Sequence, residues 1–158
     1  MIVVATTAEP GDEPRIALSP ETAKKLKALG CEVRIEKGAG ARSFFLDSAF
    51  AEAGAQVVPS AADALNGADI VLKVRRPSAE EVARMKPGAL LAAMLDPYAG
   101  KDGIEAMAQA KVNAFSMEFM PRITRAQSMD VLSSQANIAG YKAVVDAAAH
   151  FSRAFPMM

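Results

Sequence analysis

The chain has 158 residues, of which 51% are apolar and 23% are charged, and its 18 Lys and Arg residues balance its 18 Asp and Glu residues. This composition is globular, and the length allows one domain with a sizeable core or two very small domains. A net charge of zero and the lack of Trp argue against nucleic acid or an anionic membrane surface as a partner. The one cysteine, Cys31, excludes an intrachain disulfide and fits a reducing compartment. Without a signal-peptide pattern or an apolar run near the roughly 18 residues of a membrane span, we expect a soluble chain.

Short apolar runs alternate with helix signals along most of the chain. Ser19 can cap a helix that begins at Pro20 and ends at Gly30, Ser60 can cap a second, and Ser78 and Glu81 form a capping box for a third. We predict strands over residues 2–5, 31–36, 56–58, 69–74 and 112–117, and helices over residues 20–30, 47–53, 60–67, 78–86 and 103–111. Residues 88–95 form either a strand or a short buried segment.

This alternation predicts βαβ units, and therefore an α/β fold with a doubly wound, mainly parallel sheet and helices on both faces. We expect an N-terminal domain over residues 1–132. One long helical pattern follows over residues 133–155, within a connecting segment of residues 133–158. Because the chain ends in the apolar Phe-Pro-Met-Met, we expect this helix to pack against something outside the chain, which would make the chain the first part of a longer polypeptide. The alternative is that the end folds back onto its own sheet.

Two possible cofactor signals are weak. Gly38-Ala39-Gly40 follows a predicted strand, as a dinucleotide fingerprint does, but the third glycine position is occupied by Ser43. We interpret these glycines as a turn, with a phosphate loop as the minor alternative, so the domain is Rossmann-like without the glycine fingerprint. His150 is the only histidine and has no metal ligands at suitable spacing, so we expect no metal site.

Two basic residues stand at predicted strand ends. Lys73 lies at the end of the run DIVLKV, and Arg15 lies in the loop after the first strand. Ligands of doubly wound sheets gather at the carboxyl ends of strands, so both side chains are candidates to face a cleft. A solvated strand end is an equally good interpretation for each.

The segment RITRAQSMDVLSSQ, residues 122–135, is the strongest site candidate. It follows a predicted strand and brings together Arg122, Gln127, Asp130 and Ser133. Capping of the long helix explains one or two of these residues but not all four. Arg and Ser offer donors and Asp offers an acceptor, which together suit an amide. The nicotinamide carboxamide fits this set, and so do many amino acids and sugars.

The run MEFMPRITRAQSMDVLSSQANIAGYKAV closely resembles the signature of the alanine dehydrogenase/transhydrogenase family. EPGDEPRIALSPETAKKLKALGCEVRIEKGAG and VLKVRRP resemble the family's opening and middle, so the resemblance spans nearly the whole chain. The resemblance is to the N-terminal part of the NAD(H)-binding alpha subunit of proton-translocating transhydrogenase. It implies that a Rossmann domain follows residues 133–158, and that NADH passes a hydride directly to NADP⁺ on a separate domain or subunit.

The resemblance also implies residue roles and partners. Arg122, Asp130 and Ser133 would orient the nicotinamide carboxamide, and Gln127 would lie beside the nicotinamide ribose. On this basis Gln127 and Asp130 are the candidate catalytic residues, and all four are candidates to bind NAD(H). The implied partners are a second copy in a homodimer, an NADP(H)-binding domain and a membrane subunit that translocates protons. The implied location is the cytoplasmic face of the inner membrane.

Two alternatives stay open. Alanine dehydrogenases resemble this chain, and they hold pyruvate with an Arg and a Lys at the positions of Arg15 and Lys73. They also use a catalytic His after the strand that matches GALLAAML, where this chain has no histidine in residues 92–96. That departure favours transhydrogenase, because a general acid is missing. A non-catalytic scaffold for dimerisation or docking is the other alternative.

Overall fold

The computed structural model describes residues 1–154. The chain divides into two compact units, residues 1–117 and residues 118–158, which are treated separately. The predicted domain boundary at residues 132/133 lies inside the second unit. None of the helices in the described part of the chain combines the length and apolar character needed to cross a membrane.

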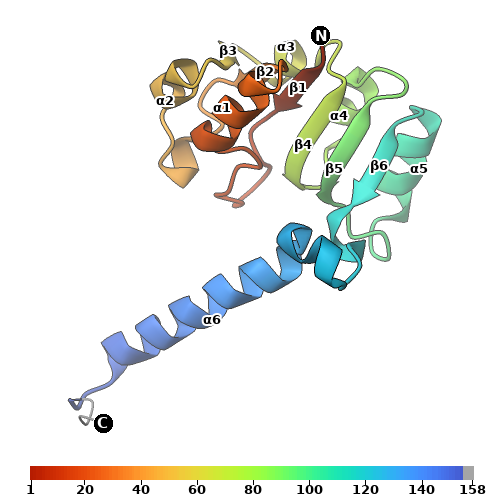
Figure 1. Cartoon of the computed structure of the whole chain (residues 1–158). Helices are drawn as coiled ribbons and strands as arrows, with labels where there is room; N and C mark the ends of the chain where they lie inside the picture. The colour runs from red at the N-terminus through yellow and green to blue at the C-terminus, as the bar shows by residue number, and fades with distance from the viewer. Residues whose placement is uncertain (155–158) are drawn as a thin grey trace. The chain divides into compact units, whose positions relative to one another are not determined.

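The first unit is built on one parallel sheet (Figure 1). Within the described residues it has six strands: β1 Val3–Thr6, β2 Glu32–Glu36, β3 Gln56–Val58, β4 Ile70–Arg75, β5 Leu90–Met94 and β6 Asn113–Ser116. The strand order is β3-β2-β1-β4-β5-β6, and every neighbouring pair is parallel. The chain therefore winds outward in one direction from β1 and then in the other direction from β4. This confirms the predicted doubly wound fold, and the segment 88–95 contains the strand β5, Leu90–Met94.

The helices of this unit begin where the sequence signals them, with one exception. They are α1 Pro20–Ala28, α2 Asp47–Glu52, α3 Ala61–Leu65, α4 Ala79–Arg84 and α5 Lys101–Gln109. The capping predictions are confirmed, because the side chains of Ser19, Ser60 and Ser78 each accept the backbone N–H of the residue three positions further along. Ser78 and Glu81 form the complete capping box.

The exception is α5, whose predicted start is wrong by two residues. The helix begins at Lys101, so Gly103 lies inside its first turn. Both glycines at this end of the helix lie against a side chain that is distant in sequence. A Cβ at Gly100 would lie 1.0 Å from Nη1 of Arg76, and a Cβ at Gly103 would lie 2.8 Å from its Cδ. The two glycines therefore make room for an arginine side chain that local helix signals do not reveal.

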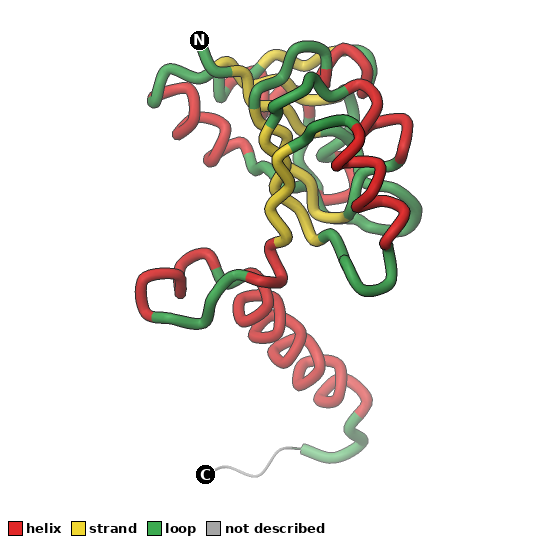
Figure 2. The backbone as a smooth tube through the Cα atoms, turned by 90° about the vertical axis from the view of Figure 1, so that its right-hand side faces the viewer, coloured by secondary structure: helices red, strands yellow, loops and turns green. Residues whose placement is uncertain are grey.

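Helices lie on both faces of the sheet (Figure 2). Two apolar clusters pack them against it. One cluster joins α3, α4 and α5 to the sheet through Leu65, Val82, Met107 and Leu91. The other joins α1 and α2 to β2 through Ala23, Phe50, Val33 and Ile35. Strands buried between two helical layers account for the near-continuous apolar runs of the sequence.

The glycines after β2 form a turn, as predicted. Gly38 has φ of +76°, a conformation that favours glycine. A Cβ at Gly40 would lie 2.7 Å from the carbonyl oxygen of Phe45 and from the ring of Phe50. The third glycine of a fingerprint is absent, and a short 3-10 helix, Ala41–Ser43, follows instead of an α-helix.

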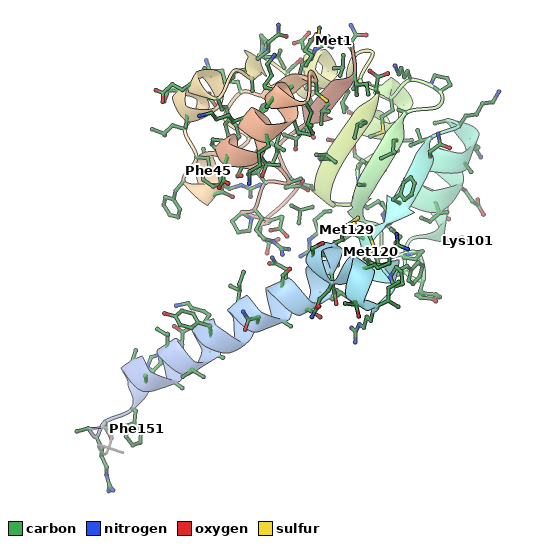
Figure 3. The ribbon with its side chains drawn as sticks, viewed as in Figure 1. Met1, Phe45, Lys101, Met120, Met129 and Phe151 are labelled. Atoms are coloured by element: carbon green, nitrogen blue, oxygen red, sulfur yellow. The ribbon has the colours of Figure 1, made fainter. Side chains whose placement is uncertain are left out.

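The second unit contains α6, Val131–His150, preceded by a 3-10 helix, Thr124–Met129. The predicted span of 133–155 starts two residues too late and includes residues 151–154, which are not helical. The start differs because Asp130, rather than a serine, is the N-cap. The helix stops because Phe151 adopts an extended backbone with ψ of 119°, while Phe155 lies outside the described residues. Side chains project from α6 in Figure 3, and none of its residues is buried in this structure.

Candidate functional site

The structure places the four predicted site residues around the start of α6. Arg122 precedes the 3-10 helix, Gln127 lies within it, Asp130 caps α6, and Ser133 is in the first turn of α6. The carbonyl oxygen of Gln127 accepts the backbone N–H of Asp130 at 3.4 Å. Ala126 of the 3-10 helix is buried, with only 4% of its surface exposed, whereas Arg122, Gln127 and Ser133 are exposed.

Asp130 and Ser133 are directly bonded. Oδ1 of Asp130 accepts the backbone N–H of Ser133 at 3.0 Å, and Oδ2 accepts the Ser133 hydroxyl at 2.6 Å. The capping interpretation is therefore correct for these two residues. Because the Ser133 hydroxyl gives its one proton to Asp130, its oxygen keeps two lone pairs and presents an acceptor to any further partner.

The charge of Asp130 is well supported. The hydrogen bond from the Ser133 side chain, followed by the bond from the Ser133 backbone, lowers the pKa of Asp130, and the charge of Arg122 lowers it further. Asp130 is thus an ionised acceptor at neutral pH, and Arg122 is close enough to act on it electrostatically. Arg122 offers hydrogen-bond donors, and Asp130 and the Ser133 oxygen offer acceptors. An amide ligand requires both kinds of group.

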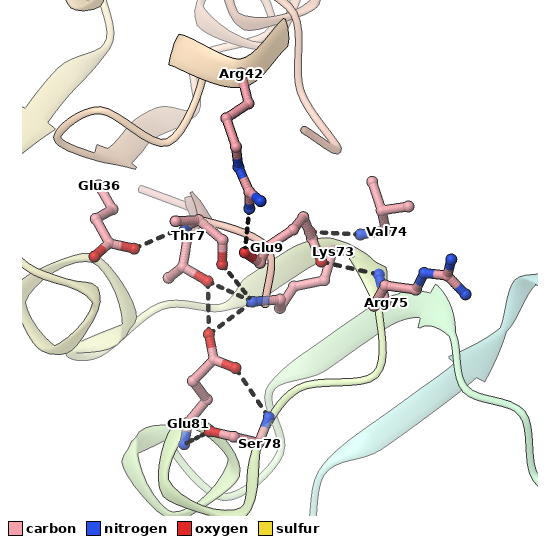
Figure 4. A network of polar contacts seen from close by, with 10 residues as sticks. Thr7, Glu9, Glu36, Arg42, Lys73, Val74, Arg75, Ser78 and Glu81 are labelled. Carbon is pink, nitrogen blue, oxygen red and sulfur yellow. Dashed lines mark hydrogen bonds and ion pairs between the residues drawn. The ribbon is translucent and has the colours of Figure 1, made fainter. Parts of the chain in front are cut away.

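A second polar cluster lies at the carboxyl ends of β1 and β4 (Figure 4). Lys73 has a side chain with no exposed surface. Its Nζ donates to Oε1 of Glu81 at 2.7 Å, to Oγ1 of Thr7 at 2.8 Å and to the carbonyl oxygen of Ala8 at 3.0 Å. The interpretation of Lys73 as a solvated strand end is therefore wrong. Lys73 does point inward at the strand end, but toward acceptors of its own chain.

Glu81 serves two purposes in this cluster. Its Oε1 accepts Lys73 and the Thr7 hydroxyl, the latter at 2.7 Å, while its Oε2 accepts the backbone N–H of Ser78 at 2.9 Å. Burial raises the pKa of Glu81, but the hydrogen bonds from Lys73, Ser78 and Thr7 outweigh it and the pKa is lowered. The capping box of α4 is thus tied to the end of β1.

Two glutamates that sequence reasoning missed complete the cluster. The carboxylate of Glu9 accepts the backbone N–H groups of Val74 at 2.7 Å and Arg75 at 3.0 Å. The carboxylate of Glu13 accepts Nε of Arg15 at 2.6 Å and Nε of Arg75 at 2.9 Å. The side-chain hydrogen bond from Arg15 is the main cause that lowers the pKa of Glu13 to about 2.

The loop with Glu9 and Glu13 carries one local signal, the sequence Glu-Pro-Gly-Asp-Glu-Pro-Arg. It predicts a turn-rich segment but does not reveal partners more than 60 residues away. Arg15, the other candidate from the sequence, contributes to this cluster through Glu13. In the described part of the chain no three His, Cys, Asp or Glu side chains gather in a way that could hold a metal ion.

Comparisons with known proteins identify the family of the chain and agree with its fold. The family model for the alanine dehydrogenase/PNT N-terminal domain matches residues 6–139. The first of the alpha-subunit polypeptides of NAD(P) transhydrogenase from Rhodospirillum rubrum is 48% identical over 99% of this chain and 42% of its own length. Alanine dehydrogenase from Mycobacterium tuberculosis is 31% identical over 97% of this chain and 41% of its own length.

A solved structure of transhydrogenase from Sinorhizobium meliloti is 52% identical and superposes with a TM-score of 0.91. The match covers 100% of this chain and 47% of that chain. The chain thus spans less than half the length of these relatives. The matched model covers most of the chain, including Arg122, Gln127, Asp130 and Ser133. The chain belongs to the alanine dehydrogenase/PNT family through its N-terminal domain, and its strong resemblance within that family is to the alpha subunit of NAD(P) transhydrogenase.

Proposed function

We propose that the chain is part of the NAD(H)-binding component of a proton-translocating transhydrogenase, and that residues 122–133 supply its nicotinamide side. The observation that carries the proposal is the bonded pair of Asp130 and Ser133, set beside Arg122. A helix cap needs only Asp130 or Ser133 and leaves the exposed Arg122 and Gln127 without a purpose. An amide-binding role uses the arginine as well.

The hydrogen-bond polarity of this set suits a carboxamide. The guanidinium of Arg122 can donate to the amide oxygen, while Asp130 and the Ser133 oxygen can accept from the amide NH2 group. Ser133 acts in this proposal as an acceptor, because its proton is already given to Asp130. The Asp130 carboxylate therefore both caps α6 and orients the hydroxyl of Ser133.

The task of these residues in hydride transfer is positioning. The nicotinamide ring, when bound, supplies the hydride chemistry, so the chain need not provide an acid or a base. Arg122, Asp130 and Ser133 fix the orientation of the amide and hence of the ring attached to it. Gln127, on the 3-10 helix three residues before Asp130, is proposed to lie beside the nicotinamide ribose.

The names of the relatives support an assembly of several subunits, and we propose its composition from the family resemblance. NADP(H) is bound by a separate domain or subunit, and a membrane subunit translocates protons. The component is a homodimer on the cytoplasmic face of the inner membrane. Residues 1–132 form its first domain, and the helix of residues 133–158 leads to a Rossmann domain that holds the pyrophosphate of NAD(H).

The proposal is tested by substitutions in the natural protein that contains this chain. Arg122→Ala should slow hydride transfer from NADH to NADP⁺ by roughly 100-fold, which is the scale of a misplaced reacting group. Arg125→Ala is the matched control, because Arg125 is exposed in the same segment but has no assigned role. Equal rates for the two variants, with both folded by circular dichroism, would reject the site.

A further inference from the structure

The strand order of the first unit defines a place where ligands of doubly wound sheets usually bind. The winding direction reverses between β1 and β4, and the crevice outside the carboxyl ends of those two strands is the general ligand position of this architecture. In this chain, residues 7–15 leave β1 at that position. These residues are called the strap below, and their contacts are with the ends of β2 and β4, with α4 and with the turn after β2.

The strap supplies the hydrogen-bond acceptor for two backbone N–H groups at the end of β4. The pairing of β4 with β5 is irregular between Leu72 and Arg75, and there the N–H groups of Val74 and Arg75 donate to the Glu9 carboxylate. Consecutive N–H groups of this kind form an anion-binding concavity. Glu9 is only 5% exposed, so the anion in this concavity is a side chain of the strap itself.

The cationic side chains near the end of β4 also form hydrogen bonds within the chain. Lys73 has three N–H donors, and it meets three acceptors: the hydroxyl of Thr7, the carbonyl of Ala8 and the carboxylate of Glu81. The guanidinium groups of Arg15 and Arg75 both donate to Glu13, which is 5% exposed. Each of these cationic and N–H groups, which an anionic ligand would use here, is therefore bonded to a carboxylate, hydroxyl or carbonyl of the same chain.

The outer side of the strap is fastened as well. Arg42 donates to the carbonyl oxygens of Glu9 and Gly11, each at 2.6 Å, and Ser43 donates to that of Pro14 at 2.6 Å. Glu36, at the end of β2, accepts the N–H of Ala8 at 2.8 Å. The strap is thus held on both sides rather than left as a mobile loop.

We propose that the strap closes the switch point of this sheet to small carboxylate ligands such as 2-oxo acids, and that Lys73 is the residue that fastens it. A carboxylate that reached Lys73 or the N–H groups of Val74 and Arg75 would have to displace Glu81 or Glu9. Lys73 is then a positioning residue for Thr7 and Ala8 and not a substrate ligand. The inference does not depend on the nicotinamide site, because it concerns other residues in the other unit of the chain.

The fastening role of Lys73 is tested by hydrogen exchange. Lys73→Met keeps the length of the side chain but removes its charge and donors, leaving the half-buried Glu81 without this partner. We expect backbone amides of residues 7–15 to exchange roughly 100-fold faster in this variant. Lys25→Met removes a lysine whose pair with Glu21 is exposed, and it should leave strap exchange unchanged. Unchanged strap exchange in a folded Lys73→Met variant would overturn the assignment.

The closure itself is tested without relying on that variant. Oxamate, a 2-oxo acid mimic, is titrated into the unmodified chain while the amide signals of residues 7–15 and 73–76 are followed by NMR. No saturable shift is expected for the unmodified chain, whereas Glu13→Gln should give one because Arg15 and Arg75 lose their counter-ion. Saturable binding to the unmodified chain would overturn the proposal, and so would a Glu13→Gln variant that binds no oxamate.

Discussion

The carboxylate of Asp130 caps α6 and is also proposed to accept a hydrogen bond from the nicotinamide amide. Its two oxygens accept the N–H and the hydroxyl of Ser133, and these bonds lower its pKa from the ordinary value of 3.8. A group whose pKa is lowered in the folded state stabilises that state above its ordinary pKa and loses the effect as the pH falls through the lowered value. Asp130 should therefore stay ionised throughout the neutral range.

Asp130→Asn separates the two roles. Asn is as good an N-cap as Asp, so the protection of the Ser133 and Ser134 amides from hydrogen exchange should persist. An Asn amide can donate to the Ser133 oxygen, which reverses the polarity of the pair, and hydride transfer in the natural protein should slow far more than folding is perturbed. Asp130→Ala is the control that loses both the cap and the acceptor. Full transfer activity in Asp130→Asn would remove Asp130 from the site.

The lowered pKa of Glu13 predicts that the free energy of unfolding decreases at acid pH. Its pKa falls from 4.5 to about 2, mainly through the side chain of Arg15, so its stabilising effect is complete above about pH 4.5 and fades as the pH falls toward 2. Urea unfolding measured from pH 6 to 2 should show this loss in the native chain and a flatter profile in Glu13→Gln. Identical profiles for the two proteins would contradict the bonds assigned to Glu13.

For single residues, the sequence indicated those contacts whose partners are close in the chain. Asp130 and Ser133 are three residues apart, and their hydrogen bonds follow from helix geometry. Glu9, Glu13 and Lys73 have partners 62 to 66 residues distant. Only the winding of the sheet brings those groups together, so neither the spacing nor the composition of the loop could have shown what Lys73 contacts.

At the scale of elements, Glu81 of α4 completes the capping box with Ser78 and also bonds Thr7 of the strap. Ser78→Ala removes the cap and should lower the free energy of unfolding by about 1 kcal/mol. Glu81→Ala also leaves Lys73 buried without its carboxylate and should cost about 3 kcal/mol. Ser60→Ala, which removes the cap of α3, gives the reference for a cap alone. A Glu81→Ala cost no larger than that of Ser60→Ala would contradict the role of the Lys73 bond.

Gly140 is a second test at this scale. It lies inside α6, and a Cβ added there would meet no atom within 4 Å. Gly140→Ala should therefore raise the helix content of this chain and stabilise α6 by about 1 kcal/mol or less, because alanine has the higher helix propensity. Thermal unfolding followed by circular dichroism checks this. A loss of helix would show that the glycine is packed against a neighbour in solution.

The strands and caps were predictable because their signals are periodic or adjacent in sequence. The limits of α5 and α6 were not marked by these signals. At the start of α5, Gly100 and Gly103 lie against Arg76, a contact that helix propensity does not indicate. The helical pattern of residues 133–155 is apolar on several sides and contains no breaker near His150, so propensity alone did not mark the end of α6.

At the scale of the whole molecule, the chain matches 42% of the Rhodospirillum rubrum relative, and its sequence has no phosphate loop besides the Gly38–Gly40 turn. We therefore expect residues 1–158 alone to bind NADH weakly or not at all, since helix N-termini with close-approaching glycines normally hold the pyrophosphate. Isothermal titration calorimetry on this chain checks the expectation. Micromolar affinity would show that a nucleotide site is complete within these residues.

The natural protein should not oxidise alanine. Residues 92–96 contain no histidine, and Asp96 follows β5 with φ of +45°. The strap commits Lys73 and Arg15 to internal carboxylates. Added L-alanine and NAD⁺ should give no NADH by absorbance, whereas steady NADH production would place the protein among the alanine dehydrogenases. A scaffold without catalysis differs from both, because it predicts no NADH binding by the natural protein.

In the function we propose, this chain helps to hold the nicotinamide of NADH for direct hydride transfer. The most direct measurement uses the natural protein that contains the chain, assembled with its NADP(H)-binding component and supplied with NADP⁺ and with NADH deuterated at the transferred position of the ring. Mass spectrometry of the product should show the deuterium in NADPH, with no exchange into water, and the rate should fall in Arg122→Ala but not in Arg125→Ala. NADPH that forms without the label, or no transfer at all by the intact assembly, would contradict the claim.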